Sequence, residues 1–251
     1  MININITTNK FWKKYKENDL KIWIKGYIYS HTIDRIIDIC KDIKKDEVSS
    51  FLASIDGHFA LIVQKDDLTF IAVDKIRSVP LFFVNIKNDY FIDCDPKNLV
   101  NLNKFDKTID ENAKLEIAMS GFTIGNKMIY KNLHSLKAGE TVLFKENNYE
   151  YLHYYKYFGE IVNKNFNEYL EELSEVTLNI FKKMLNQIGK RQIIIPLSAG
   201  NDSRLVASIL KYLGATNVKC YSYGAAGNFE AKIAKIIAHK LGYEWKFIPL
   251  T

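Results

Sequence analysis

The stretch IIIPLSAGNDSRLVASIL, residues 193–210, joins a run of β-branched residues to a helix-like pattern through a loop of small residues. The isoleucine run at its start predicts a buried strand, and the apolar spacing after residue 203 predicts an amphipathic helix. The loop between them is SAGNDS, residues 198–203. Whether this strand, loop and helix form one unit of a repeated β-α pattern decides the fold of this part of the chain.

The same order of elements continues to the end of the chain. Further strands are predicted at 218–223 and 245–250, and helices at 203–214 and 229–242 lie between the three strands. This alternation predicts βαβ crossovers and a parallel sheet. We expect its core to contain Ile193, Ile194, Ile195, Val206, Ile209, Leu210, Val218, Ile233 and Ile237.

A long amphipathic helix is predicted upstream, at 167–190. We expect its apolar stripe to pack against the core, and the alternative is a helix that binds a partner. The stripe consists of Leu170, Leu173, Thr177, Ile180, Phe181, Met184 and Ile188.

The first 155 residues have a different pattern, that of an α+β domain with hairpins. Residues 19–30 alternate like a strand, and residues 33–55 predict a helix. Three hairpins are predicted, turning at Asp66-Asp67, at 87–89 and near Asn147-Asn148. The expected core face of the helix consists of Ile33, Ile36, Ile37, Cys40 and Ile43.

Composition excludes several classes of protein. The 251 residues carry a net charge of +6, but the basic residues are almost all scattered lysines interleaved with acids, which indicates a solvated surface instead of a nucleic-acid-binding face. Nothing at the start of the sequence resembles a signal peptide, and no apolar stretch is long enough to span a bilayer. Three widely spaced cysteines without a CxxC pair argue against a disulfide framework or a zinc site, so we expect a cytoplasmic protein.

The SAGNDS loop has the chemistry of a phosphate site. Small residues let backbone N–H groups surround an anion, and a helix N-terminus adds partial positive charge. Ser198 and Ser203 supply hydroxyl groups, and the Asp202 carboxylate could hold a magnesium ion bound to phosphate oxygens. The alternative is that Asn201 or Asp202 only caps the helix. The loop residues alone do not decide between the two.

The surrounding residues resemble a known family. PLSAGNDSR, residues 196–204, resembles the SGGxDS pyrophosphate loop of the N-type ATP pyrophosphatases, in particular the asparagine synthetases, and residues 221–245 are similar to the segment that follows it there. Upstream, KGYIYS, IDGHFALIV, VDKIRSVPLFF, YFIDCDPKNLV and MIYKNLHSLKAGETVLF resemble, in order, the glutaminase domain of that family. The resemblance implies an α+β N-terminal-nucleophile-hydrolase-like sandwich at 1–157, which is a degenerate glutamine amidotransferase-like domain. It implies the start of an α/β parallel-sheet nucleotide-binding domain at 158–251.

The resemblance also implies an activity: ATP adenylates a carboxylate, and ammonia or an amine then displaces AMP, as in amino-acid biosynthesis. ATP, magnesium and a carboxylate-containing small molecule are the implied ligands, without nucleic acid or membrane. The residues implied in ATP and pyrophosphate binding are Ser198, Ala199, Gly200, Asn201, Asp202 and Ser203. Asp202 is also implied in binding the magnesium ion of the nucleotide. Ser222, Tyr223 and Gly224 are implied near the adenine and ribose, with packing at the strand end as the equal alternative.

Two departures from the family limit this activity. The family's glutaminase nucleophile is a cysteine directly after the initiator Met, where this chain has Ile2, and Lys25-Gly26 replaces the Asn-Gly pair that stabilises the oxyanion. We therefore expect no glutaminase activity, and we expect the family's opening strand and its loop to be lacking. The chain also ends at Thr251, before the family's later strands, which predicts an apolar edge at residues 192–197.

Two explanations of that end remain open: a fragment of a longer synthetase, or a domain completed by a homodimer or another partner. The rival to an enzyme is a non-catalytic nucleotide-binding or interaction protein that keeps the fold.

Overall fold

The computed structural model describes residues 4–6, 11–65, 68–87, 89–145 and 148–250. Ile2 and the expected turn residues Asp66, Asp67 and Asn147 lie outside these ranges, as does residue 88 of the expected turn at 87–89. The chain divides into two compact units, Met1–Gly159 and Glu160–Thr251. The expected boundary after residue 157 falls beside this division, and each unit is described separately below.

Among the described residues, the larger sheet of unit 1 has six strands in the order β10-β9-β5-β4-β3-β2, and each neighbouring pair is antiparallel. The predicted strand at 19–30 is β3, and two of the predicted hairpins, β4–β5 and β9–β10, are confirmed here. The strands are β2 (Trp12–Glu17), β3 (Leu20–Ile28), β4 (Gly57–Gln64), β5 (Thr69–Val73), β9 (Glu140–Lys145) and β10 (Asn148–His153).

The smaller sheet has the order β1-β7-β6-β8, with β1 (Ile4–Ile6), β6 (Phe82–Ile86), β7 (Asp89–Asp93) and β8 (Leu133–Ser135). The third predicted hairpin, β6–β7, is confirmed. The expectation that an opening strand is lacking is wrong, because β1 pairs in parallel with β7, with Ile4 opposite Tyr90. Three residues are too short a run for alternation to reveal a strand, so β1 is visible only through its pairing.

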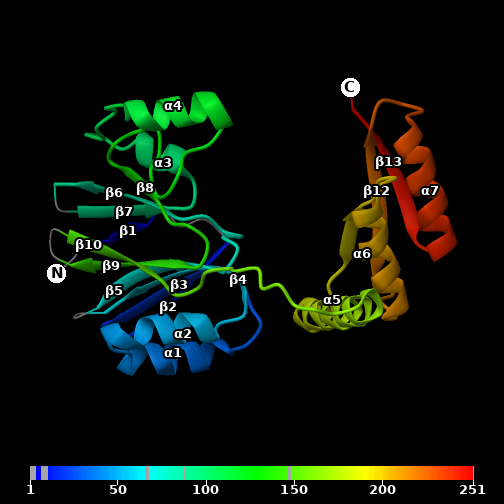
Figure 1. Ribbon diagram of the computed structural model, residues 1–251, viewed down its shortest axis with the longest axis horizontal. Coiled ribbons are helices and arrows are strands. Elements are labelled where there is room, and N and C mark those ends of the chain that lie inside the picture. The colour runs from blue at the N-terminus through cyan, green and yellow to red at the C-terminus, as the bar shows by residue number, and fades with distance from the viewer. Residues whose placement is uncertain (1–3, 7–10, 66–67, 88, 146–147, 251) are drawn as a thin grey trace. The chain divides into compact units, whose positions relative to one another are not determined.

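Unit 1 has four layers, helix, sheet, sheet and helix (Figure 1). The outer face of the larger sheet is covered by α1 (Ile33–Asp42), a short 3-10 helix (Lys45–Glu47) and α2 (Val48–Ser54). The expected face of α1 is confirmed: Ile36, Cys40 and Ile43 are buried, and Ile33 and Ile37 pack against the same core. The prediction of one helix over 33–55 is wrong. The backbone at Ile43 leaves the helical conformation and ends α1, and the 3-10 helix begins at residue 45.

A second core lies between the two sheets, and a third lies beyond the smaller one. Phe83, Tyr90 and Phe144 are buried between the sheets, where their rings pack edge-on or tilted against each other. On the far face of the smaller sheet, Phe82, Val84 and Leu133 pack with α3 (Pro96–Val100), and α4 (Glu111–Ser120) follows α3 in the chain. Two packed sheets with helices outside them make a sandwich.

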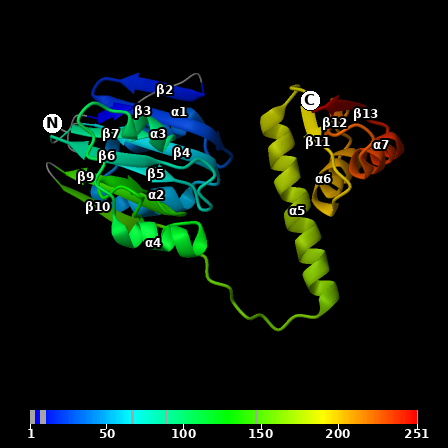
Figure 2. The ribbon, with the colours of Figure 1, turned by 90° about the horizontal axis from the view of Figure 1, so that it is seen from above.

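Unit 2 contains the predicted β-α alternation. Its strands β11 (Ile193–Pro196), β12 (Val218–Gly224) and β13 (Glu244–Pro249) are parallel and lie in that order. Helices α6 (Asn201–Tyr212) and α7 (Phe229–Leu241) connect them, and α5 (Phe166–Ile188) precedes them (Figure 2). Within the described residues β11 is an edge strand, as the sequence predicts.

The core of unit 2 lies on one face of this sheet. Ile195, Ile209, Leu210 and Val218 are buried as expected, while Ile193, Val206 and Ile237 pack partly buried against them and Ile233 is half-buried. Ile194 is 61% exposed, so its expected burial is wrong. Successive strand residues point to opposite faces, and α6 and α7 contribute to the core on the face of Ile195 alone.

The expected core face of α5 is wrong for much of its length. Phe181 and Met184 pack against the core, Thr177 and Ile188 are half-buried, and Leu170, Leu173 and Ile180 are exposed. The apolar groove between α5 and α6 is open, with Leu170, Leu173, Leu205 and Tyr212 among its lining residues. A helical stripe therefore predicted the side of α5 that is apolar, but not how much of it is covered.

Candidate functional site

The SAGNDS loop leaves the carboxyl end of β11 and begins α6. The Leu197 N–H donates to the Tyr221 carbonyl at 2.8 Å, which continues the β11–β12 pairing up to the loop. The Ser203 hydroxyl then accepts from the Ser198 N–H at 3.1 Å, and the two serine Oγ atoms are 3.0 Å apart. The Gly200 N–H donates to Ser198 Oγ at 3.1 Å. These bonds fold the loop back on itself, so the two serines shape it.

The N-terminus of α6 has no side-chain cap. Its N-cap is Gly200, and no side chain bonds to the first-turn amides from that position. By contrast, α5 and α7 of the same unit are capped by Asn165 and Asn228. Asn201 and Asp202 lie inside the helix, so the alternative that either residue caps it is wrong. Uncapped first-turn amides and the helix dipole favour an anion at this position.

Two charged side chains flank this helix start. Asp202 lies in the first turn and is exposed. The Arg204 guanidinium donates to the Asn201 side-chain oxygen, which holds a cation on the first turn. Sequence analysis missed Arg204; its only signal was its place directly after the loop.

The second predicted group, Ser222, Tyr223 and Gly224, ends β12 beside the loop. Ser222 is buried, and its hydroxyl donates to the Leu197 carbonyl at 2.7 Å while accepting from the Trp245 indole at 3.0 Å. Tyr223 is 59% exposed, and the Gly224 carbonyl accepts from the Leu250 N–H. The SAGNDS loop and the end of β12 therefore lie at the same end of the sheet. The Ser222 hydroxyl connects them through its hydrogen bond to Leu197, the residue before the loop.

Magnesium fits this donor set only together with phosphate. Among the described residues, no cluster of three His, Cys, Asp or Glu side chains could hold a metal ion. Asp202 is the single carboxylate of the loop, and two serine hydroxyls lie beside it. Magnesium is commonly bound through one or two carboxylates plus substrate phosphates, so the loop suits a magnesium–nucleotide complex better than a free ion.

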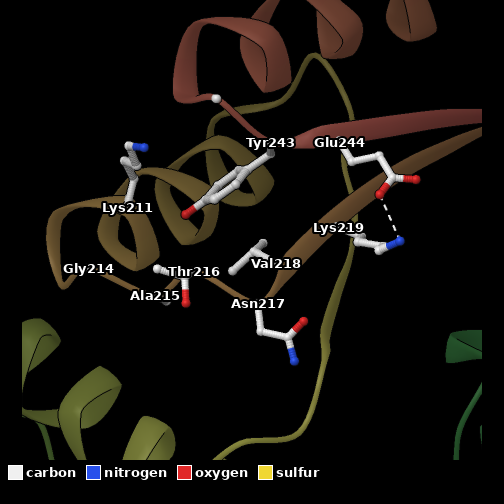
Figure 3. A pocket seen from close by; sticks show the side chains of 10 residues that line it. Lys211, Gly214, Ala215, Thr216, Asn217, Val218, Lys219, Tyr243 and Glu244 are labelled. Atoms are coloured by element: carbon white, nitrogen blue, oxygen red, sulfur yellow. Dashed lines mark ion pairs between the residues drawn. The ribbon is translucent and has the colours of Figure 1, made fainter.

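A pocket of about 540 Å³ lies at the opposite end of the sheet (Figure 3). Its side chains are already paired, since Lys219 bonds to Glu244 at 2.7 Å and the Lys211 ammonium lies 5.9 Å from the centre of the Tyr243 ring. In parallel α/β sheets ligands bind outside the carboxyl ends of the strands. This pocket is at the amino ends, so the loop at the carboxyl ends is the better candidate for a ligand site.

In unit 1, the residues that match the family's oxyanion pair lie near the end of β3. The Lys25 ammonium donates to Cys94 Sγ at 2.9 Å and provides no neutral amide. Gly26 has φ 101°, and a Cβ on it would be 2.0 Å from the His58 carbonyl oxygen. The close approach of β3 and β4 therefore requires a glycine at position 26, and the side chain beside it is an amine instead of a neutral amide.

Comparison with known proteins finds a family model that matches part of unit 1. Residues 44–156 match the model of the glutamine amidotransferase domain family. Unit 1 therefore contains a glutamine amidotransferase-like domain, consistent with the resemblance of its motifs. No curated protein matches the chain.

The solved structures that are similar to it include two enzymes. One is glutamine phosphoribosylpyrophosphate (PRPP) amidotransferase from B. subtilis complexed with ADP and GMP, with TM-score 0.39 and 10% identity, covering 96% of this chain and 73% of that one. The other is described as the allosteric regulatory enzyme of purine biosynthesis, with TM-score 0.35 and 11% identity, covering 92% of this chain and 45% of that one. In the described part of the chain, no helix is long and apolar enough to cross a membrane.

We expect the purified chain to release no ammonia from glutamine. By the resemblance, Lys25 stands where the family has its oxyanion amide and Ile2 where it has its nucleophile. Loss of one oxyanion donor alone lowers kcat by about 10²–10³-fold. The assay is glutamate production from glutamine, compared with heat-denatured protein. Steady glutamate formation above that control would contradict the prediction.

Proposed function

We propose that this chain takes part in ATP-dependent amide formation of the asparagine-synthetase type, with ATP held by the SAGNDS loop. The observation that carries the proposal is the uncapped start of α6 directly after a parallel strand. A helix start with free amides, two hydroxyls and one carboxylate matches what a magnesium–pyrophosphate group needs. The glutamine amidotransferase-like domain in unit 1 supports the same class of enzyme.

In this proposal each loop residue has a distinct task. The first-turn amides of α6 and the hydroxyls of Ser198 and Ser203 contact phosphate oxygens, and Asp202 holds the nucleotide's magnesium. Magnesium, when bound, neutralises phosphate charge and favours departure of pyrophosphate. The substrate carboxylate attacks the α-phosphate, pyrophosphate leaves, and a nitrogen nucleophile then displaces AMP.

The nitrogen in this scheme does not come from glutamine hydrolysed by unit 1. Free ammonia, another amine, or an amine of the substrate itself in a ring closure would supply it. Unit 1 then acts as a scaffold that retains the amidotransferase fold. We place the protein in the cytoplasm, because its three cysteines form no disulfide with one another.

A second candidate is a non-catalytic nucleotide-binding or interaction protein. The observation that favours it is the exposed face of the unit 2 sheet, where Ile194, Tyr223 and Ile248 are 61%, 59% and 42% exposed. Apolar side chains on an uncovered sheet face indicate a surface that another polypeptide covers. Formation of AMP from ATP in the presence of a carboxylate would distinguish the enzyme from this alternative.

Asp202→Ala is expected to weaken Mg-ATP binding about tenfold or more, which corresponds to about 1.4 kcal/mol. The melting temperature should hardly change, because Asp202 is exposed and does not cap α6. Glu230→Ala is the matched control, since Glu230 lies in the first turn of α7, which Asn228 caps. Calorimetric titration of Mg-ATP into the three proteins measures the difference. Equal affinities for all three would contradict the role of the loop.

A further inference from the structure

Lys25 is a cation placed between the two sheets of unit 1. Strand β3 alternates, so that Ile22 and Ile24 face the helices while Trp23 faces the smaller sheet with the inter-sheet core. Lys25 is two residues beyond Trp23 and therefore faces the same way. Its ammonium lies 6.0 Å from the centre of the Trp12 ring and 2.9 Å from Cys94 Sγ.

The nitrogen–sulfur distance is short for a hydrogen bond to sulfur. N–H···O bonds are most often about 2.9–3.0 Å long, and sulfur is a larger atom than oxygen. In the described ranges, the side-chain partners of Lys25 are Cys94 and the Trp12 ring, without a carboxylate. An amine and a thiol are thus held together without a competing ion pair.

Cys94 also differs from the other two cysteines in its access to solvent. It follows β7 and is half-buried, whereas Cys40 and Cys220 are buried. Burial raises the pKa of Cys40 to about 12 and also raises that of Cys220. Thiols that remain protonated react slowly with oxidants, so Cys40 and Cys220 are poor targets for oxidation. Small oxidants also reach the half-buried Cys94 more readily than either buried thiol.

We propose that Lys25 and Cys94 form an oxidation-dependent covalent cross-link in which one oxygen atom bridges Lys25 Nζ and Cys94 Sγ. The oxidant is molecular oxygen. The Lys25 ammonium first releases one proton to solvent. The resulting amine then loses one N–H hydrogen, and the thiol loses its S–H hydrogen. One atom of dioxygen forms the new N–O and O–S bonds, and the other leaves with the two hydrogens as water. The nitrogen and the sulfur are oxidised and dioxygen is reduced. Excess dithiol cleaves the bridge by reduction: two dithiol molecules supply four electrons, the amine and the thiol form again, and the bridging oxygen leaves as water.

The cross-link would tie the two sheets of unit 1 together. Lys25 belongs to β3 of the larger sheet, and Cys94 follows β7 of the smaller one, 69 residues away in the chain. A covalent tie between distant segments restricts the unfolded chain and raises stability. The oxidised protein is therefore expected to melt at a higher temperature than the reduced one, a difference that dithiothreitol removes.

The test is peptide mass spectrometry of the full chain after incubation in air or under argon. We expect a linked peptide pair containing Lys25 and Cys94 in air only, with the summed mass of the two peptides plus one oxygen and minus two hydrogens. Cys94→Ser and Lys25→Met should lose this pair, and the matched variant Cys40→Ser should keep it. The comparison of air with argon uses the wild type and does not depend on the folding of any variant.

Three results would overturn the proposal. One is the recovery of only linear peptides from aerated protein. Another is oxidation of Cys94 to sulfinic acid or to a disulfide without any link to Lys25. The last is persistence of the linked pair in Cys94→Ser.

Discussion

Ile195→Asp is expected to unfold unit 2, while Ile194→Asp leaves it folded. The two residues are neighbours on β11, but Ile195 is 4% exposed and Ile194 is 61% exposed. An uncompensated buried charge costs about 3–5 kcal/mol, a large part of the stability of a small domain. An exposed substitution away from other features usually changes stability by less than about 0.5 kcal/mol.

Hydrogen exchange read by mass spectrometry measures this prediction for unit 2 alone. Peptides that cover β12 and α7 should lose protection in Ile195→Asp and keep it in Ile194→Asp. Peptides of unit 1 are the internal control, because that unit has its own core. Loss of protection in both variants would mean that the outer face of the sheet is covered in solution, and equal protection in both would contradict the assignment of the core.

The contrast between these two residues shows what periodicity can predict. The order of strands and helices after residue 190 was predictable, because strand and helix patterns alternate there without interruption. The exposure of Ile194 was not, because three consecutive isoleucines are typical of a strand covered on both faces. The exposure of part of α5 was not predictable either. Its apolar stripe includes Leu170 and Leu173, which lie beyond the part of the helix that the core covers.

The candidate site was predictable to a similar extent. The sequence placed SAGNDS between a strand and a helix, and the structure has it there. The sequence could not show which serine hydroxyls form hydrogen bonds within the protein, because such bonds depend on contacts between distant segments. Ser222 bonds to Leu197 and Trp245, and no local pattern records such contacts. The absence of a cap on α6 likewise required backbone geometry, since Asn201 and Asp202 are both common capping residues.

Gly26→Ala is expected to destabilise unit 1 by about 3 kcal/mol or more, while Gly125→Ala costs about 1 kcal/mol, the low end of the range for a strained backbone. Both glycines have positive φ, 101° and 79°. A Cβ on Gly26 would be 2.0 Å from the His58 carbonyl oxygen, whereas nothing lies within 4 Å of one on Gly125. The control variant therefore has the backbone strain without the collision.

The collision is costly because it falls between two interior strands of the larger sheet. Gly26 pairs with Phe59 across β3 and β4, and Phe59 is 1% exposed. Relief requires the two strands to separate, which disturbs the ladder and the core beneath it. Chemical denaturation of both variants, followed by circular dichroism, measures the difference in unfolding free energy. Similar losses would show that strain alone sets the requirement for glycine at position 26.

This comparison also explains how one residue of a motif can be kept while the residue beside it changes. In the Lys25-Gly26 pair, the glycine is required by the close approach of two strands, and its requirement does not depend on glutamine hydrolysis. The neighbouring side chain is free of that constraint, and here it is a lysine bonded to Cys94. A fold-determining residue and a catalytic one can therefore lie side by side and change independently. If Gly26→Ala is strongly destabilising and the chain still releases no ammonia from glutamine, the resemblance of unit 1 to glutamine amidotransferases is one of architecture.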